Sequence, residues 1–552
     1  MMKNAIRSKL TTEYVPPVRI VAKSDSVTGE EFLLTNRFTQ IFTKEKDCMR
    51  CKGKGYLILD FGAELCGGVR FLTYRVLPDL IGRVRIRFGE SVGEACAEIG
   101  EKNATCHHSV RDMTVQIPNL SDQEWGRTGF RFVRIDFLDE QEYSFVNVYA
   151  SFTYRDLEFK GDFECDDELV NEIYRTARRT VFLNMQENLW EGVKRDRLVW
   201  VGDMQPEVLA ITDLFGANDC VEDAVALSVE KNPLPCWFGE IPTYSFWLIQ
   251  ILHDYYLKTG NAAFVEKYLG YVDGVLAQLD ACVTENGKID YSRCAEAGAR
   301  EGFFLDWPTV GTQDAPAGNR YTFLFVIENL KKLYAALGKE ENALCDRLLK
   351  KLRVNAEQEA SAKQIVALGY LSGCLNKDTA SRRLTQGGAK GLSTFMSYFI
   401  LRAISETDNV SSSLEIMKEY YGGMLSRGAT SFWEDFDVEW LDGSGRIDEL
   451  PEEGKKDLHG DYGKFCYRGY RHSLCHGWSC GPVPFLTEKV LGITVLEAGC
   501  RAISVKPDLG NLKWCKGAFP TPYGQVEVFC EKRDGKTVTR VRAPEEVRIE
   551  RA

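Results

Sequence analysis

One short segment, Trp190–Asp203, holds the residue types that acid–base chemistry on a sugar requires. It contains three carboxylates, Glu191, Asp196 and Asp203, together with three cationic side chains and two tryptophans. Cleavage of a bond at the anomeric carbon uses carboxyl groups for proton transfer, and nearby cations set the charge state of those groups. Aromatic rings provide a surface for the sugar ring. The segment therefore predicts a site that cleaves glycosidic bonds.

The same segment resembles a family signature. In family 78 of the glycoside hydrolases, the α-L-rhamnosidases, an acidic residue precedes a catalytic acid by five positions and an Asp follows that acid by seven. Glu191, Asp196 and Asp203 reproduce both intervals. Further matches are Arg197, Leu198, Trp200 and Gly202. The chain departs from the family at two positions. Arg195 stands where the family usually has Asp, and Asp196 stands where the usual acid is Glu. The shorter Asp requires a closer approach of the backbone to the glycosidic oxygen.

A second segment, Gly428–Asp437, resembles the part of the family that carries the catalytic base. Glu434 matches the family's glutamate, and Trp433 beside it offers an apolar wall. The stretch that follows is rich in acids, most of which we expect in a solvated loop. Asp435 and Asp437 are alternatives for the base.

The resemblance implies a role for each candidate residue. Asp196 would protonate the leaving oxygen, and Glu434 would activate water in an inverting reaction. The implied substrate-binding residues are Glu191, Arg195, Trp200, Asp203, Asp306, Trp307, Trp433, His476 and Trp478. It implies no cofactor, and the spacing of possible ligands predicts no metal site.

Several of these residues have a structural alternative. Asp203 precedes a predicted helix near Pro206 and could simply cap it. Asp196 could form an ion pair with its arginine neighbours. Trp307 could pack in a core, and a lone histidine such as His476 is often a structural residue.

The periodicity of the chain predicts three parts that position these residues. Residues 55–155 alternate as strands do, for example at Arg83–Phe88, and predict an antiparallel β-sandwich. Helical patterns follow from about residue 166. Tyr244–Leu257 is apolar on nearly every face, whereas residues 324–337 carry one apolar stripe. Such helices fit the inner and outer layers of an (α/α)6 barrel.

Short strands return after about residue 492, with a hairpin turn at 533–536. We therefore expect an all-α (α/α)6 barrel as the catalytic domain, flanked by an N-terminal β-sandwich and a small C-terminal β-domain. The expected boundaries are 1–160 for the β-sandwich, 161–490 for the barrel and 491–552 for the C-terminal domain.

Composition limits the partners and the compartment. The 552 residues carry a net charge of −11, which disfavours nucleic acid and anionic membranes as partners. The 18 scattered cysteines and a start without a secretory signal predict reduced thiols in a cytoplasmic protein. Cys48 and Cys51 form a lone CxxC whose function is open.

The resulting hypothesis is a hydrolase that removes terminal α-L-rhamnosyl groups from a small carbohydrate. One alternative is a hydrolase of the same fold that acts on a different sugar. Another is a catalytically silent sugar-binding protein. A homodimer is an assembly that the sequence leaves open.

Overall fold

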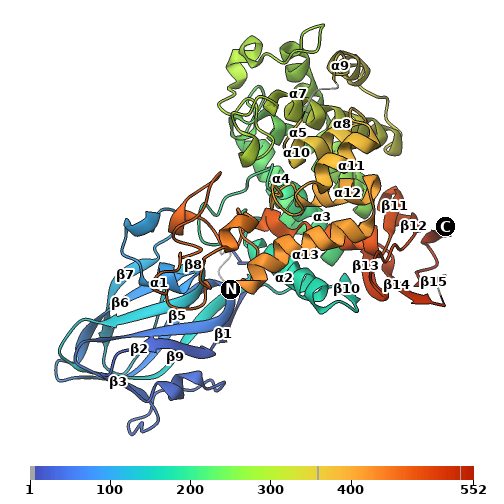
Figure 1. Ribbon diagram of the computed structural model, residues 1–552. Coiled ribbons are helices and arrows are strands. Elements are labelled where there is room, and N and C mark those ends of the chain that lie inside the picture. The colour runs from blue at the N-terminus through green and yellow to red at the C-terminus, as the bar shows by residue number, and fades with distance from the viewer. Residues whose placement is uncertain (1–5, 357–359, 535, 552) are drawn as a thin grey trace. The chain divides into compact units, whose positions relative to one another are not determined.

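The computed structural model describes residues 6–356, 360–534 and 536–551 (Figure 1). Its internal contacts divide the chain into two compact units. The first unit comprises Met1–Asp156, Phe182–Leu198 and Met424–His476. The second comprises Leu157–Val181, Val199–Gly423 and Gly477–Ala552. Each unit is therefore assembled from three separate stretches of the sequence.

The first unit is built on an antiparallel sheet with nine strands in its described residues. The order is β3-β4-β9-β5-β8-β6-β7, with β1 added on β9 and β2 on β5. The strands are β1 Leu10–Val15, β2 Arg19–Lys23, β3 Val27–Thr28, β4 Met49–Lys52, β5 Gly55–Leu77, β6 Ile81–Gly89, β7 Asp112–Pro118, β8 Ser121–Phe137 and β9 Glu142–Arg155. Alternating residues predicted strands inside β5, β6 and β8, and these predictions are confirmed.

Strand β5 changes partners along its length and thereby encloses the core. Its first half pairs with β2 and β8, and its second half pairs with β8 and β9. The register shifts between Asp60 and Leu65, where Gly62 has a φ of 85°. Such a bulge bends a strand. Apolar side chains of both halves, such as Leu59 and Phe71, then belong to one core, in which Phe88 of β6 also packs edge-to-face on Phe130 of β8 at 4.9 Å.

The second unit holds most of the helices. Among its residues α3 packs on α5, α5 on α8, α8 on α10, α10 on α12, α12 on α14, and α14 again on α3. These six helices follow a closed order of contacts. Their bounds are α3 Met204–Phe215, α5 Pro242–Thr259, α8 Ala315–Ala336, α10 Lys363–Leu371, α12 Ser397–Thr407 and α14 Pro482–Phe485. The other helices are α1 Val92–Cys96 in the first unit, and α2 Glu168–Asn184, α4 Asp219–Lys231, α6 Ala262–Glu266, α7 Leu269–Cys282, α9 Leu344–Leu352, α11 Lys377–Thr385 and α13 Val410–Ser426.

Two small sheets complete the second unit. One has the order β10-β13-β14-β15, with β10 Asp162–Cys165, β13 Trp514–Thr521, β14 Gly524–Arg533 and β15 Lys536–Arg542. The other has the order β11-β12-β16, with β11 Ile493–Glu497, β12 Ala502–Val505 and β16 Arg548–Arg551. The predicted hairpin is present, since Arg533 lies opposite Lys536. Strand β10 precedes the helices in sequence yet belongs to the C-terminal sheet.

The cysteines are free thiols at all 18 positions, each of which lies in the described residues. Cys51 packs in the main core of the sheet, whereas Cys48 packs in a separate apolar cluster. The two cysteines of the CxxC thus pack in different apolar clusters, an arrangement that does not suit a shared metal ion. None of the described helices is long and apolar enough to cross a membrane.

A buried ion pair in the sheet gives the first test. Arg131 contacts the carboxylate of Asp60 at 2.8 and 3.0 Å and donates to the carbonyl of Gly428 at 2.9 Å. Asp60→Asn leaves this buried guanidinium with only the more distant carboxylate of Asp448, at 3.6 Å, and we expect a loss of up to about 3–5 kcal/mol in unfolding free energy. Glu140→Gln breaks an exposed ion pair with Lys54 and should cost about 0–1 kcal/mol. Urea unfolding measures both, and equal losses would contradict the prediction.

Candidate active site

The predicted site residues are divided between the two compact units. One boundary runs between Leu198 and Val199, and another runs between His476 and Gly477. The first unit contains Glu191, Arg195, Asp196, Trp433, Glu434 and His476. The second unit contains Trp200, Asp203, Asp306, Trp307 and Trp478. The structure brings residues together within each group.

Glu191 shapes the loop that carries Asp196. Its carboxylate accepts hydrogen bonds from the backbone N–H groups of Arg197 at 2.9 Å and Leu198 at 2.8 Å. Asp196 and Arg197 have φ values of 54° and 53°, in the left-handed region that costs energy for side chains other than glycine. The buried carboxylate of Glu191 stabilises this turn and so fixes where Asp196 lies.

Arg195 connects the two predicted catalytic carboxylates. Its Nη1 lies 2.9 Å from Asp196 Oδ2, and its Nη2 lies 2.5 Å from both carboxylate oxygens of Glu434. The guanidinium also stacks on Tyr467, 3.9 Å from the ring centroid. Arg195 therefore forms a buried ion pair with Glu434, which lies 239 positions later in the sequence.

Glu434 is held in its ionised form. Burial alone raises the pKa of this carboxyl, but the adjacent charge of Arg195 outweighs burial and sets the pKa well below its usual range. The backbone N–H of Ser473 and the thiol of Cys466 also donate to it, at 3.2 and 2.7 Å. The carboxylate is therefore in the form that accepts a proton from water, while the ion pair with Arg195 lowers its basicity.

The two alternatives to Glu434 have other contacts. Burial raises the pKa of Asp435 to about 6, and the backbone N–H groups of Lys464 and Phe465 oppose the rise only in part. Asp437 caps a short helix by accepting a hydrogen bond from the N–H of Glu439 at 3.0 Å. Of the three acids, Glu434 has the strongest cationic partner.

His108 is a partner of Asp196 that the sequence did not single out. Its Nε2 lies 3.1 Å from Asp196 Oδ1, and Arg197 fixes its backbone by donating to the His108 carbonyl at 2.9 Å. Burial lowers the pKa of His108, and the charge of Asp196 opposes this only partly. His107 and His108 are two of only six histidines, but their spacing matches no pattern that would link them to Asp196.

His476 and Trp433 are both buried in the first unit, at 2% and 1% exposure. The N–H of His476 donates to the carbonyl of Phe432 at 3.0 Å, and His476 forms a β-bridge with Gly192. This pairing brings the predicted histidine next to the Glu191 loop. Trp433 packs edge-to-face on Phe436 at 5.5 Å.

In the second unit, Asp203 stands directly before α3 but makes no capping hydrogen bond with its side chain. The simple capping role is therefore wrong. Instead, the hydroxyl of Tyr244 donates to Asp203 Oδ1 at 2.7 Å. Trp200 packs edge-to-face on the same tyrosine at 6.4 Å, so Trp200 and Asp203 share one neighbour.

The other three residues of this unit have defined packing partners. Asp306 caps a short turn by accepting the N–H of Trp307 at 2.8 Å, and Ser393 donates to its other oxygen. Trp307 packs on Phe304 at 5.2 Å and stays partly exposed. Trp478 is buried and stacks on Phe395 at 5.0 Å, which is a core-like environment.

A cavity of about 1050 Å³ in the second unit does not coincide with this group. Its walls include Gln205, Asp254, Asn329 and Arg402, and none of the five predicted residues of the second unit lines it. The chemistry of Asp196 and Glu434 is therefore the better guide to the site than the size of this cavity.

Comparison with known proteins identifies the domains. The model of the bacterial α-L-rhamnosidase six-hairpin glycosidase domain matches residues 158–344, and the model of the bacterial α-L-rhamnosidase C-terminal domain matches residues 492–550. Two parts of the chain therefore match domain models of the bacterial α-L-rhamnosidases. This family consists of glycoside hydrolases, and the resemblance seen in the sequence is confirmed. The first match includes Asp196, whereas Glu434 lies outside both.

Solved structures share the fold. The family 78 rhamnosidase of Bacillus sp. GL1 superposes with a TM-score of 0.74 at 20% identity, over 92% of this chain and 54% of that one. A Klebsiella oxytoca rhamnosidase with rhamnose bound gives a TM-score of 0.67 at 17% identity, over 87% and 96%. The Streptomyces avermitilis α-L-rhamnosidase with L-rhamnose gives 0.70 at 15%, over 90% and 48%. The chain thus spans about half the length of the Bacillus and Streptomyces enzymes. No curated protein matches it.

The Arg195–Glu434 pair predicts that Arg195→Met reverses the pH dependence of the unfolding free energy that Glu434 contributes. In the native protein the lowered pKa of Glu434 adds stability above the unfolded value of about 4.5, and this stability is lost as pH falls. In Arg195→Met the pKa should instead lie above that value, because burial is no longer opposed by Arg195. The variant should lose about 3–5 kcal/mol at pH 7.5, and less at pH 5.

Urea unfolding at the two pH values measures this difference. Arg471→Met is the matched control, because Arg471 stacks on the same Tyr467 ring at 4.5 Å without a described ion pair to Glu434. A deficit in Arg195→Met that is equal at both pH values would contradict the assignment.

Proposed function

We propose that this chain is an inverting glycoside hydrolase that releases terminal α-L-rhamnosyl groups from a small glycoside or oligosaccharide. The observation that carries the proposal is the buried, ionised Glu434 held with Asp196 by one guanidinium. The matching domains and the rhamnose-bound relatives of similar fold support rhamnose as the sugar.

In the proposed reaction Asp196 donates a proton to the glycosidic oxygen as the bond to the anomeric carbon breaks. Glu434 takes a proton from a water molecule, whose oxygen attacks that carbon from the opposite face. This geometry requires a separation of about 6.5–9.5 Å between the carboxyl groups. Two side chains hold the proposed acid in place: His108 Nε2 lies 3.1 Å from Asp196 Oδ1, and Arg195 Nη1 lies 2.9 Å from Asp196 Oδ2.

The proposed architecture is a β-sandwich of residues 1–160, an (α/α)6 barrel of residues 161–490 and a C-terminal β-domain of residues 491–552. The closed order of contacts through α3, α5, α8, α10, α12 and α14 supports the inner layer of that barrel. The proposed sugar-binding residues are Glu191, Arg195, Trp200, Asp203, Asp306, Trp307, Trp433, His476 and Trp478. Rhamnose has a methyl group at C6, which suits the tryptophans among them.

Leaving-group dependence separates the two catalytic roles. Asp196→Asn should slow cleavage of a rhamnosyl disaccharide by about 10²–10⁴-fold, but slow a nitrophenyl rhamnoside much less, because nitrophenolate leaves without a proton. Glu434→Gln should slow both substrates alike, because both need the activated water. Azide should restore turnover of Glu434→Gln and give a glycosyl azide of inverted configuration.

The same assays decide between the functions. Unchanged disaccharide turnover in Asp196→Asn would remove Asp196 from the acid role. Hydrolysis of a different aryl glycoside, and not of the rhamnoside, would identify another sugar as substrate. Rhamnose binding without hydrolysis of any aryl glycoside would identify a silent sugar-binding protein.

A further inference from the structure

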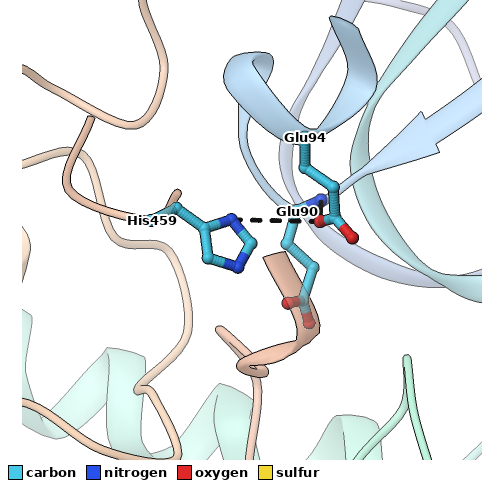
Figure 2. Close-up of side chains that lie close together, drawn as sticks. All are labelled: Glu90, Glu94 and His459. Atoms are coloured by element: carbon cyan, nitrogen blue, oxygen red, sulfur yellow. Dashed lines mark hydrogen bonds and ion pairs between the residues drawn. The ribbon is translucent and has the colours of Figure 1, made fainter. Parts of the chain in front are cut away.

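A group of buried acids and a histidine in the first unit resembles a metal site. Glu90, Glu94 and His459 offer one carboxylate oxygen or ring nitrogen each within 4.8 Å of one another (Figure 2). Glu94 lies on α1, Glu90 lies just before it, and His459 comes from the segment that follows Glu434. All three are at most 1% exposed.

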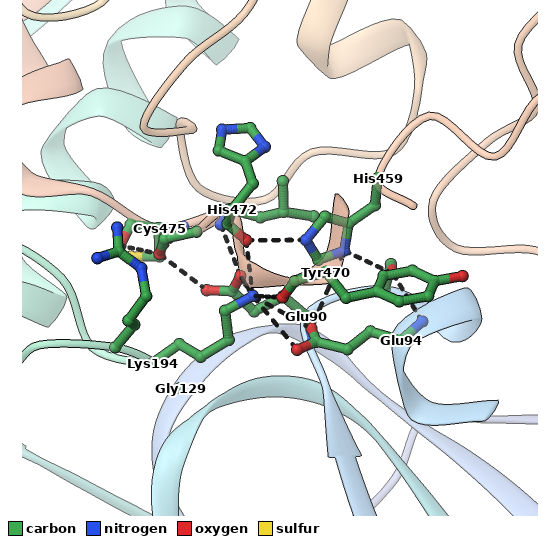
Figure 3. Close-up of polar contacts among 12 residues, drawn as sticks. Glu90, Glu94, Gly129, Lys194, His459, Tyr470, His472 and Cys475 are labelled. Atoms are coloured by element: carbon green, nitrogen blue, oxygen red, sulfur yellow. Dashed lines mark hydrogen bonds and ion pairs between the residues drawn. The ribbon is translucent and has the colours of Figure 1, made fainter. Parts of the chain in front are cut away.

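The ammonium group of Lys194 lies among these side chains (Figure 3). It is 2.8 Å from Glu90 and 3.3 Å from Glu94. It also donates to the carbonyl oxygens of Tyr470 at 2.9 Å and His472 at 2.7 Å. Burial lowers the pKa of Lys194, but the two glutamates outweigh burial, and the net shift is upward. The ammonium therefore stays charged and has oxygen neighbours like those of a bound cation.

His459 is oriented as a metal ligand would be. Its Nε2 lies 2.9 Å from the carbonyl oxygen of His472, which can only accept, so Nε2 carries the proton. Its Nδ1 is then the acceptor and receives the hydroxyl of Ser91 at 2.8 Å. Metal-bound histidines commonly donate their other ring N–H to a backbone carbonyl in this way.

Close approach of the backbone makes this arrangement possible. Gly129 lies on β8, where a Cβ atom would be 2.6 Å from the side chain of Val193 and 2.8 Å from the backbone nitrogen of Lys194. A side chain at Gly129 would therefore displace the loop that carries Lys194.

The cluster fixes the segment that contacts Glu434, Tyr470–His476, here called the strap. Lys194 binds the carbonyls of Tyr470 and His472, and Arg195 binds the carbonyl of Arg471 between them at 3.1 Å. Glu90 accepts the N–H of Leu474 at 2.6 Å. The N–H of Ser473 then donates to Glu434, and the N–H of Glu434 donates to the Ser473 carbonyl at 3.0 Å. The strap thus connects the cluster to the proposed base.

We propose that Lys194 is the built-in cation of a metal-like site formed by Glu90, Glu94, His459 and two strap carbonyls, and that through the strap it is a positioning residue for Glu434. The second half of this inference rests on the proposed function, and the first half does not. Lys194 is buried and has no described contact with Glu434, so its effect on that residue passes through the backbone of the strap.

The first experiment tests the cation site without any activity. Lys194→Ala should leave the donor set intact and without its cation, so we expect it to bind one Mn²⁺ per chain in a titration followed by electron paramagnetic resonance. Mn²⁺ should also raise the Tm of this variant. The wild type and Lys194→Ala/Glu94→Gln should show neither effect. Binding by Lys194→Ala no tighter than by the double variant would overturn the cation site.

The second experiment tests positioning. Lys194→Met should lower kcat for a rhamnoside by about 100-fold with little change in KM, because misplacement of a catalytic group by about 1 Å has that effect. Lys102→Met is the matched control: Lys102 pairs with Asp457 and Asp461 near His459 but has no described contact to the strap carbonyls, and its kcat should be unchanged.

Mn²⁺ should restore part of kcat to Lys194→Ala and none to Lys194→Met, whose side chain fills the space. Restoration of Tm without restoration of kcat would overturn the positioning role while the cation site stands. If the wild type hydrolyses no rhamnoside, the proposed function fails, and Mn²⁺ binding still decides the cation site.

Discussion

The first unit depends on placing two adjacent positive charges away from water. Lys194 and Arg195 are 6% and 4% exposed, and a buried cation without an anion is costly. Lys194 therefore requires Glu90 and Glu94 from the sheet, and Arg195 requires Glu434 from a segment more than two hundred residues later. These ion pairs bring together three stretches of sequence, and the hydrophobic pattern of the chain does not predict that they lie close together.

The same pairing gives neighbouring acids different properties. Glu434 faces a guanidinium that holds its pKa low, whereas Asp435 has no comparable cation among the described residues, and burial raises its pKa to about 6. Glu434 and Asp435 are adjacent in sequence, so a difference of one position decides which carboxylate meets Arg195. Charge complementarity, more than the count of acids, thus distinguishes a candidate base from the acidic residues around it.

Much of the fold could be predicted, because periodicity is local. The strands containing Arg83–Phe88 and the helix around Tyr244–Leu257 follow from the spacing of apolar residues within one element. Asp196 could be proposed as the acid because its signature lies within fourteen residues, and Glu434 could be proposed as the base because a short segment matches the family. The contact of His108 with Asp196 and the role of Lys194 could not be predicted. His108 lies 88 positions from Asp196, and Lys194 lies about 280 positions from the strap carbonyls that it contacts. Asp203 looked like a helix cap because its contact with Tyr244 has no local signal.

The separated stretches of the first unit also bear on how the protein is made. Glu90 and Glu94 leave the ribosome about 380 residues before the strap that completes their surroundings. At 5–20 residues per second this interval is roughly 20–80 s. For that time the nascent sheet carries two acids, destined for the interior, that remain hydrated. A similar interval separates the synthesis of β10 from that of β13, its partner in the C-terminal sheet. Each unit thus closes only after its last stretch has been synthesised, and chaperones can bind the open surfaces during that interval.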